Sequence, residues 1–275
     1  MRIMKRITFL MTTLIAMMMG THTAQAQIEV ELDPADQAVL RQMQMESEID
    51  SIVMEINRSA GLISEMSEKK EAAADTSSQR ILLFGDSMLD GIGRRMQDYA
   101  DHNGHSLYTS IWYGSTVHSW ARTTELERLM EKVKPTFVII SLGTNDLGYH
   151  DLQARAQSVH EILRVVGDVP YVWIGPAKLP RLNKDFGIVG MLRENVGDNL
   201  FYDSYNMRLA RFPDNVHPTF AASATWIDRV AEWMTRPGAP HAIRMDKPDH
   251  QAKFRNYETH SPRYKGTPKG GQACR

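Results

Sequence analysis

Short runs of apolar residues alternate with amphipathic stretches between residues 80 and 236. Such apolar runs are typical of strands buried on both faces of a parallel sheet, and apolar residues at helical spacing predict the covering helices. The alternation therefore predicts an α/β domain with helices on both faces of the sheet. Strands are expected over residues 81–84, 107–112, 137–142, 171–174 and 199–202. Helices are expected over residues 88–102, 123–132, 152–166, 189–195 and 220–234.

We assign this domain to residues 79–236 and expect three layers, α/β/α, around a flavodoxin-like parallel sheet of about five strands. The preceding residues 27–78 are acidic and contain no aromatic residue. Apolar residues at helical spacing between Pro34 and Ile63 predict a helical extension, and the polar residues 67–78 predict a linker. The helix is interpreted as a spacer or packing helix, with an oligomerisation or partner helix as the alternative.

The C-terminal residues 237–275 are polar, basic and rich in proline and glycine. Such a segment contains too few large apolar residues to bury the surface that ordering requires. We therefore predict a flexible tail, with sorting or the binding of an anionic polymer as alternative roles.

The first 26 residues have the three parts of a secretory signal peptide. Arg2, Lys5 and Arg6 form a basic start, residues 7–19 are apolar, and the Ala-Gln-Ala sequence at 24–26 is a small-x-small cleavage site. We predict a cleaved leader, no retained membrane span, and a secreted or periplasmic location.

Composition limits the partners further. The chain has 275 residues and a net charge of −1, which argues against nucleic acid because phosphate binding needs a basic face. Cys274 is the single cysteine, so no disulfide forms within the chain. We find no Cys/His set with metal-ligand spacing and no glycine-rich phosphate loop, and we expect neither a metal nor a cofactor. The oligomeric state is left open.

The candidate chemistry begins at Ser87, which follows the first predicted strand and precedes the first predicted helix. Ligands bind at the carboxyl ends of the strands in open α/β sheets, and a helix N-terminus presents free N–H groups to an anion. A second polar motif, Gly-Thr-Asn-Asp at 143–146, follows the third strand. Asp214 and His217 precede the last helix and are three residues apart, the spacing at which side chains on one helical turn meet. Together these motifs provide a nucleophile, a base, an orienting carboxylate and an amide donor.

These residues resemble the SGNH/GDSL hydrolase family of serine esterases and lipases over residues 80–234. The Gly-Asp-Ser motif at 85–87, with Gly91 four residues beyond Ser87, matches the family's first block. Residues 143–146 match its third block, and residues 214–218 match its Asp-x-x-His block with the following proline. The second block requires a glycine after the second strand, and Gly114 is the looser match there.

The resemblance implies that Ser87 is the nucleophile, His217 the general base, and Asp214 the carboxylate that orients the histidine. It implies an oxyanion hole made by the backbone N–H groups of Ser87 and Gly114 and by the side-chain amide of Asn145. No metal or other cofactor takes part in this scheme.

Some neighbouring residues have two interpretations. Asp86 and Asp146 are interpreted as structural carboxylates that bind nearby N–H groups. Trp112, His118 and Trp120 line a substrate pocket or simply pack, and residues 178–190 form a substrate loop or an ordinary connection.

We expect a secreted serine esterase acting on an ester substrate, such as an O-acetyl group on a cell-envelope or extracellular glycan. The alternatives are an acyltransferase that uses the same triad and a catalytically inactive binding or scaffold module.

Overall fold

The structure is a computed structural model that describes residues 75–182 and 184–270, together with residues 37, 41–42, 44–45, 48–49 and 51–58. The chain forms two units, Met1–Ser64 and Glu65–Arg275. In the first unit every described residue is helical, within the segment where the sequence predicts a helix. Its apolar side chains, Ile52 and Met54 among them, are exposed. The predicted signal peptide and most of the predicted linker lie outside the described residues.

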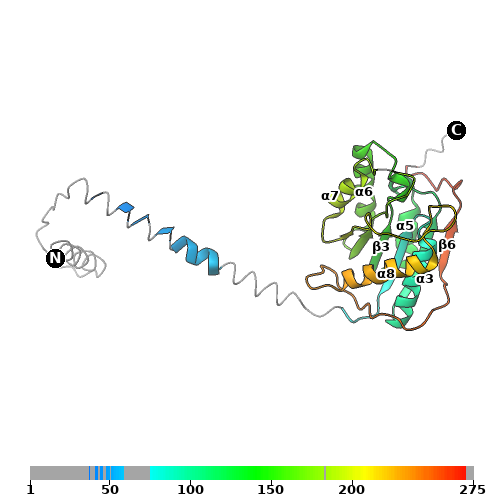
Figure 1. The fold of residues 1–275 in the computed structure, drawn as a ribbon, viewed down its shortest axis with the longest axis horizontal. Helices are drawn as coiled ribbons and strands as arrows, with labels where there is room; N and C mark the ends of the chain where they lie inside the picture. Colours follow the sequence, from blue (N-terminus) through cyan, green and yellow to red (C-terminus); the bar gives the residue numbers. More distant parts are fainter. Residues whose placement is uncertain are drawn as a thin grey trace, which may run out of the picture. The chain divides into compact units, whose positions relative to one another are not determined.

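The second unit is built on a parallel sheet of six strands in the order β5-β4-β3-β1-β2-β6 (Figure 1). The order of the first five strands is the flavodoxin-like one, as the sequence predicts. The strands are β1 (Arg80–Gly85), β2 (Ser106–Trp112), β3 (Phe137–Ser141), β4 (Tyr171–Ile174), β5 (Phe201–Tyr202) and β6 (Tyr257–His260).

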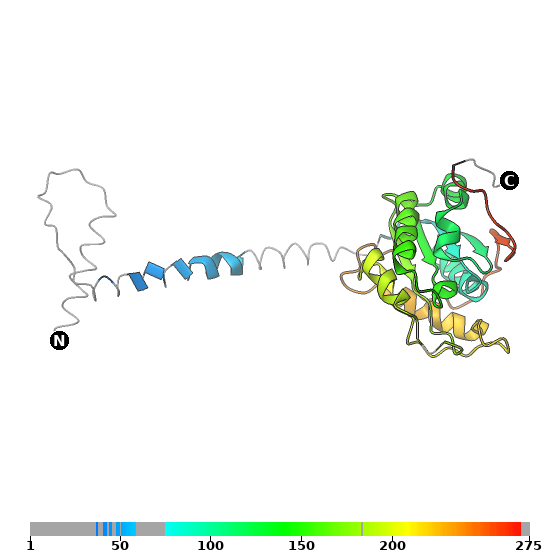
Figure 2. The same cartoon turned by 90° about the horizontal axis from the view of Figure 1, so that it is seen from above.

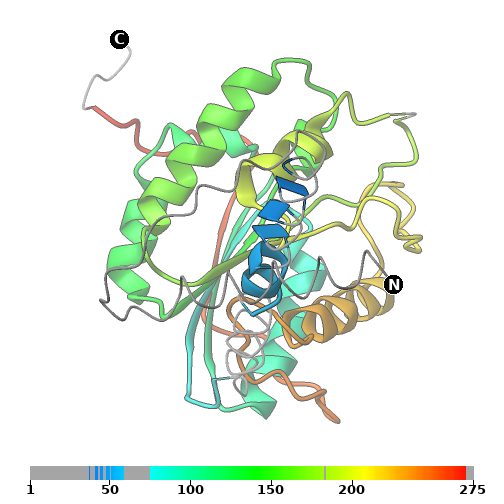
Figure 3. The ribbon, with the colours of Figure 1, turned by 90° about the vertical axis from the view of Figure 1, so that its left-hand side faces the viewer.

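Helices cover both faces of this sheet, which confirms the three-layer prediction (Figure 3). Leu82 and Phe84 of β1 face a core shared with α4, α5, α6 and α7, whereas Ile81 and Leu83 face a core shared with α3 and α8. The helices are α3 (Leu89–His102), α4 (Val117–Ala121), α5 (Glu125–Val133), η1 (Thr144–Asp146), α6 (Leu152–Val166), α7 (Ile188–Val196) and α8 (Phe220–Met234). The sequence did not predict α4.

Helices α3 and α8 pack closely because Gly91 lies at their crossing. A Cβ atom at Gly91 would lie 2.1 Å from the Ser223 hydroxyl oxygen of α8. Any larger residue at this position would therefore push the two helices apart.

The C-terminal segment corrects the sequence analysis: residues 237–270 are folded onto the domain and do not form a flexible tail. Ile243 and Met245 are buried in the core beneath α3 and α8, and β6 pairs with β2 at the edge of the sheet (Figure 2). Asn103, just after α3, binds the backbone of Asp246 through both its amide nitrogen and its amide oxygen, each at 2.8 Å. These contacts with distant parts of the chain hold the segment in place, although it contains few large apolar residues of its own.

None of the helices in the described parts of the chain combines the length and the apolar character needed to cross a membrane.

Candidate active site

Ser87 lies in a tight turn between β1 and α3, at the carboxyl edge of the sheet. The turn needs Gly85, because a Cβ atom there would lie 2.0 Å from the backbone oxygen of Ser141 on β3. Asp86 Oδ1 accepts a hydrogen bond from the Met88 backbone N–H at 3.0 Å, which fixes the entry to α3. Ser87 itself is 7% exposed, so its hydroxyl is held in place with one side open.

His217 and Asp214 belong to a loop that closes just before α8. The Phe212 N–H donates to the His217 carbonyl oxygen at 2.9 Å, and the Thr219 N–H donates to the Ala210 carbonyl oxygen at 2.9 Å. Asp214 Oδ1 accepts the N–H groups of Val216 and His217 at 2.8 and 3.0 Å. The two side chains therefore meet across a turn held by the aspartate, and not on a helical turn as the sequence spacing suggests.

The structure brings Ser87, His217 and Asp214 into one hydrogen-bonded chain. His217 Nε2 lies 2.8 Å from Ser87 Oγ, and His217 Nδ1 lies 2.7 Å from Asp214 Oδ2. The hydrogen bond from His217, followed by the two backbone N–H bonds, lowers the pKa of Asp214 to about 2. Asp214 is therefore a carboxylate at neutral pH, so it accepts a proton-bearing Nδ1 and leaves Nε2 to accept from the serine hydroxyl.

Gly114 lies on the loop that follows β2, and Asn145 lies in η1 shortly after β3, at the same edge as Ser87. Asn145 Nδ2 donates to the Ser115 carbonyl oxygen at 2.9 Å, which joins the segments that follow β2 and β3. This bond uses one of the two N–H groups of the Asn145 amide. Gly114 has φ of +73°, a conformation that favours glycine. Within the described residues, neither the Ser87 nor the Gly114 backbone N–H donates a hydrogen bond to the protein. Both donors are thus available to a ligand.

Asp86 and Asp146 are buried carboxylates beside this edge, and neither contacts His217 in a hydrogen bond. Burial raises the pKa of Asp86 to about 7 and that of Asp146 to about 6. Asp146 accepts the Val117 N–H at 3.1 Å and lies 2.9 Å from the guanidinium of Arg155. These contacts are those of structural groups that tie α3, α4 and α6 to the sheet.

The tryptophans near Gly114 pack in the core and line no cavity found near Ser87. Trp120 lies 5.5 Å from Trp112 and 4.8 Å from Phe84, measured between ring centroids. His118 Nδ1 lies 3.0 Å from the Ser158 hydroxyl and joins α4 to α6. The packing interpretation therefore holds for all three candidate pocket residues.

A cavity of about 300 Å³ opens beside Ser87 and His217. Its wall includes Phe212, Phe220 and Arg94, which the sequence analysis did not identify. The position of Phe220, three residues after His217, is the sequence feature that could have identified it as a residue of the site. Lys178, from the predicted substrate loop, lines a different cavity of about 480 Å³.

A grouping of possible metal ligands occurs elsewhere. Among the described residues, His102, Asp249 and His250 form a group whose ligand atoms lie within 4.8 Å of one another. Asp249 and His250 are exposed, and exposed groups of this kind are common without a metal.

No family model and no curated protein matches the chain. Among solved structures, a gut microbial diltiazem-metabolizing enzyme is similar, with 16% sequence identity and a TM-score of 0.37. The match covers 57% of this chain and 48% of the other, so it spans about half the length of that enzyme. A likeness this weak indicates no function, and the functional argument depends on the site.

Proposed function

We propose that the protein is a serine esterase of the SGNH/GDSL type, with Ser87 as nucleophile. The observation that carries the proposal is the Asp214–His217–Ser87 chain, with contacts of 2.7 and 2.8 Å at the carboxyl edge of a parallel sheet. A serine within hydrogen-bond reach of a histidine that is itself oriented by a carboxylate is the arrangement that activates a hydroxyl for attack. This contact supports an active enzyme over a binding module.

In the proposed reaction, Ser87 Oγ attacks the ester carbonyl carbon while His217 Nε2 takes the hydroxyl proton. The carbonyl oxygen becomes an oxyanion held by the Ser87 and Gly114 N–H groups and by the Asn145 amide. The C–O bond to the alcohol then breaks, His217 returns the proton to the leaving alcohol, and the acyl group remains on Ser87. A water molecule, deprotonated by His217 Nε2, then attacks the acyl carbonyl carbon. The bond between that carbon and Ser87 Oγ breaks, His217 returns the proton to Ser87 Oγ, and the carboxylic acid leaves.

The proposed location is the periplasm or the extracellular space, after removal of residues 1–26. The proposed substrate is an O-acetyl ester on a cell-envelope or extracellular glycan. The location supports this class of substrate, since an exported enzyme meets glycan esters and not cytosolic thioesters.

Replacement of the nucleophile tests the reaction. We expect Ser87→Ala to lower hydrolysis of p-nitrophenyl acetate by on the order of 10⁴-fold or more, because the hydroxyl is the attacking group. The variant should also lose covalent labelling by a fluorophosphonate, detected as a mass increase of the intact chain. Ser106→Ala is the matched control, because Ser106 begins β2 at the edge of the sheet away from Ser87. This variant should retain both hydrolysis and labelling. Wild-type turnover by Ser87→Ala would refute the proposed role.

A further inference from the structure

Two adjoining cavities, each of about 300 Å³, share the wall formed by Gly91, Arg94 and Phe220. The inner cavity contains Ser87 and His217, and the outer one extends along α3 toward the C-terminal segment. A substrate bound with its ester at Ser87 therefore has room for a second group in the outer cavity, next to Arg94.

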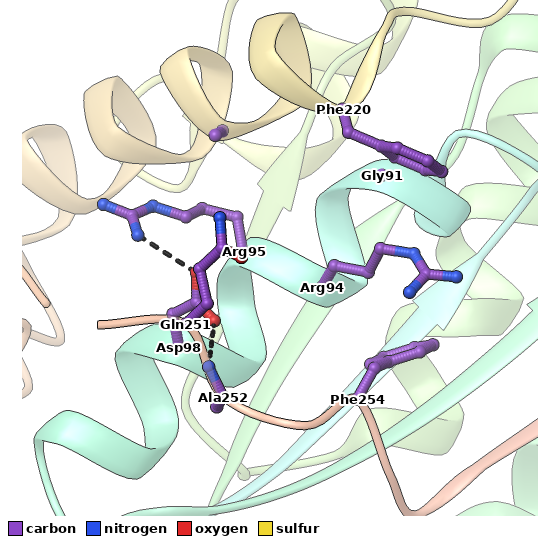
Figure 4. A pocket seen from close by; sticks show the side chains of 9 residues that line it. Gly91, Arg94, Arg95, Asp98, Phe220, Gln251, Ala252 and Phe254 are labelled. Carbon is purple, nitrogen blue, oxygen red and sulfur yellow. Dashed lines mark hydrogen bonds and ion pairs between the residues drawn. The ribbon is translucent and has the colours of Figure 1, made fainter.

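Arg94 is held between two aromatic rings at the junction of these cavities. Its guanidinium carbon lies 5.0 Å from the centroid of the Phe220 ring and 5.4 Å from that of Phe254 (Figure 4). The Phe254 ring is itself fixed by stacking on Tyr257, with centroids 4.5 Å apart and an interplanar angle of 10°. Cation–π contacts of this kind orient the guanidinium without occupying its N–H donors.

Arg94 also differs from the other charged residues of the outer cavity. Arg95 lies 3.0 Å from Asp98 and 2.8 Å from Asp228, so its charge is compensated. Asp98 further accepts the Ala252 N–H at 2.8 Å. The Arg94 side chain points away from Arg95 and Asp98 (Figure 4). Among the described residues, Arg94 has no ion-pair partner. The outer cavity therefore has an uncompensated positive charge.

The inner cavity has two carboxylates in addition to the Arg94 side of the wall that it shares with the outer cavity. Asp214 contributes the carboxylate of the triad, and Asp90 contributes a carboxylate that accepts the Tyr113 hydroxyl at 2.9 Å. Because both carboxylates line only the inner cavity, an anionic group on a substrate is favoured on the outer-cavity side of Arg94 and disfavoured beside Ser87. This difference gives a substrate with one charged end a preferred orientation.

We propose that Arg94 binds an anionic group, a carboxylate or a phosphate, on the ester substrate. This inference rests on the proposed esterase function and names the substrate class as esters with an anionic substituent away from the scissile bond. The planar guanidinium fork suits either oxyanion by paired N–H···O bonds. Phe220 and Phe254 provide apolar surface on which the part of the substrate next to that group packs.

The test compares charged esters with matched neutral esters. The probes are p-nitrophenyl hydrogen glutarate against p-nitrophenyl butyrate, 4-acetoxybenzoate against phenyl acetate, and 4-acetoxyphenyl phosphate against phenyl acetate. The first pair places a carboxylate on the acyl group, and the other two place a carboxylate or a phosphate on the leaving alcohol. In at least one pair we expect the wild-type protein to favour the charged ester, with a preference that weakens as salt is added.

Arg94→Gln should lower that preference, measured as the ratio of kcat/KM values, roughly tenfold and mainly through KM. Arg94→Lys keeps the charge without the fork and should give an intermediate ratio. Arg229→Gln removes an exposed charge of α8 outside both cavities and should leave the ratio at the wild-type value.

A ratio that Arg94→Gln leaves unchanged, or a wild-type protein that prefers the neutral ester in all three pairs, would overturn the inference while leaving the esterase intact. Failure of the wild-type protein to cleave any probe would instead overturn the proposed function.

Discussion

The buried carboxyl of Asp86 should make the stability of the fold depend on pH in a direction opposite to that of most carboxylates. The side chain is fully buried, and burial raises its pKa from 3.8 to about 7. In the unfolded chain the group ionises near its ordinary value. Between these two values the folded state therefore binds one proton more than the unfolded state.

The sign follows from this difference in bound protons. The stabilisation by the protonated carboxyl is fully present below about pH 4 and is lost as the pH rises through about 7. At ~1.4 kcal/mol per pKa unit, the complete loss is about 4 kcal/mol, of which about 3 kcal/mol falls between pH 5 and pH 8. The charge of Asp146 acts in the same direction but is secondary to burial.

Asp86→Asn removes the ionisation and keeps an oxygen acceptor for the Met88 N–H. We expect the variant to gain about 3 kcal/mol relative to the wild-type protein between pH 5 and pH 8, measured as free energies of unfolding in urea. Asp168→Asn, an exposed aspartate, is the control for loss of one negative charge. If the free-energy difference between Asp86→Asn and wild type is the same at both pH values, the carboxyl is already ionised in the folded state and the reasoning is wrong.

Two further substitutions test other parts of the structure. Ile243→Ala should lower the free energy of unfolding by about 2–5 kcal/mol in urea titrations, because Ile243 is 3% exposed, whereas Lys253→Ala in the same segment should change it little. Arg211 donates hydrogen bonds to the carbonyl oxygens of Val216 and Lys178, so Arg211→Gln should loosen the loop that carries His217. We expect its kcat for p-nitrophenyl acetate to fall roughly tenfold with KM little changed, and Arg211→Lys to recover part of the loss. An unchanged kcat would remove Arg211 from the positioning of the base.

Hydrophobic periodicity predicted the central helices and strands well, because the apolar positions in their sequences are the positions that the fold buries. The predicted helices 152–166 and 220–234 coincide with α6 and α8, and the predicted strand 171–174 coincides with β4. Every residue of β3 is buried, which is why the strand appears in the sequence as an uninterrupted apolar run. A single sequence is therefore sufficient to locate those helices and strands whose buried positions are occupied by apolar residues.

The C-terminal segment was predicted wrongly because polar contacts over long sequence separations hold it, and composition does not indicate them. Glu258 of β6 accepts from the Tyr108 hydroxyl at 2.7 Å and from Ser110 at 3.1 Å, and it pairs with Arg128 of α5. Arg255 binds Asp101 of α3 at 2.6 Å. Each partner lies more than 100 residues away in the sequence, so neither periodicity nor local charge pattern predicts the pairing.

The positions of Ser87 and Asn145 could be predicted for a different reason, since parallel topology gathers the strand ends at one edge whatever lies between them. The same topology explains why the outer cavity was missed. Arg94 and Phe220 are near Ser87 and His217 in the sequence, but the third residue of the cation–π group, Phe254, comes from the segment that composition assigned to a tail.

The helices that follow the proposed catalytic residues form one wall of the outer cavity, and the C-terminal segment forms the other. Gly91 and Arg94 follow Ser87 on α3, and Phe220 begins α8 directly after the His217 loop. Changes that move the backbone of this wall, such as replacement of Gly91 at the α3–α8 crossing, would disturb the proposed catalytic residues as well. Phe254, which precedes the edge strand β6, lines the outer cavity and not the inner one that contains Ser87 and His217, so substitutions there can alter which esters bind without moving Ser87. Substrate choice is therefore separable from bond cleavage at the C-terminal side of the outer cavity, whereas the two are coupled where α3 and α8 cross.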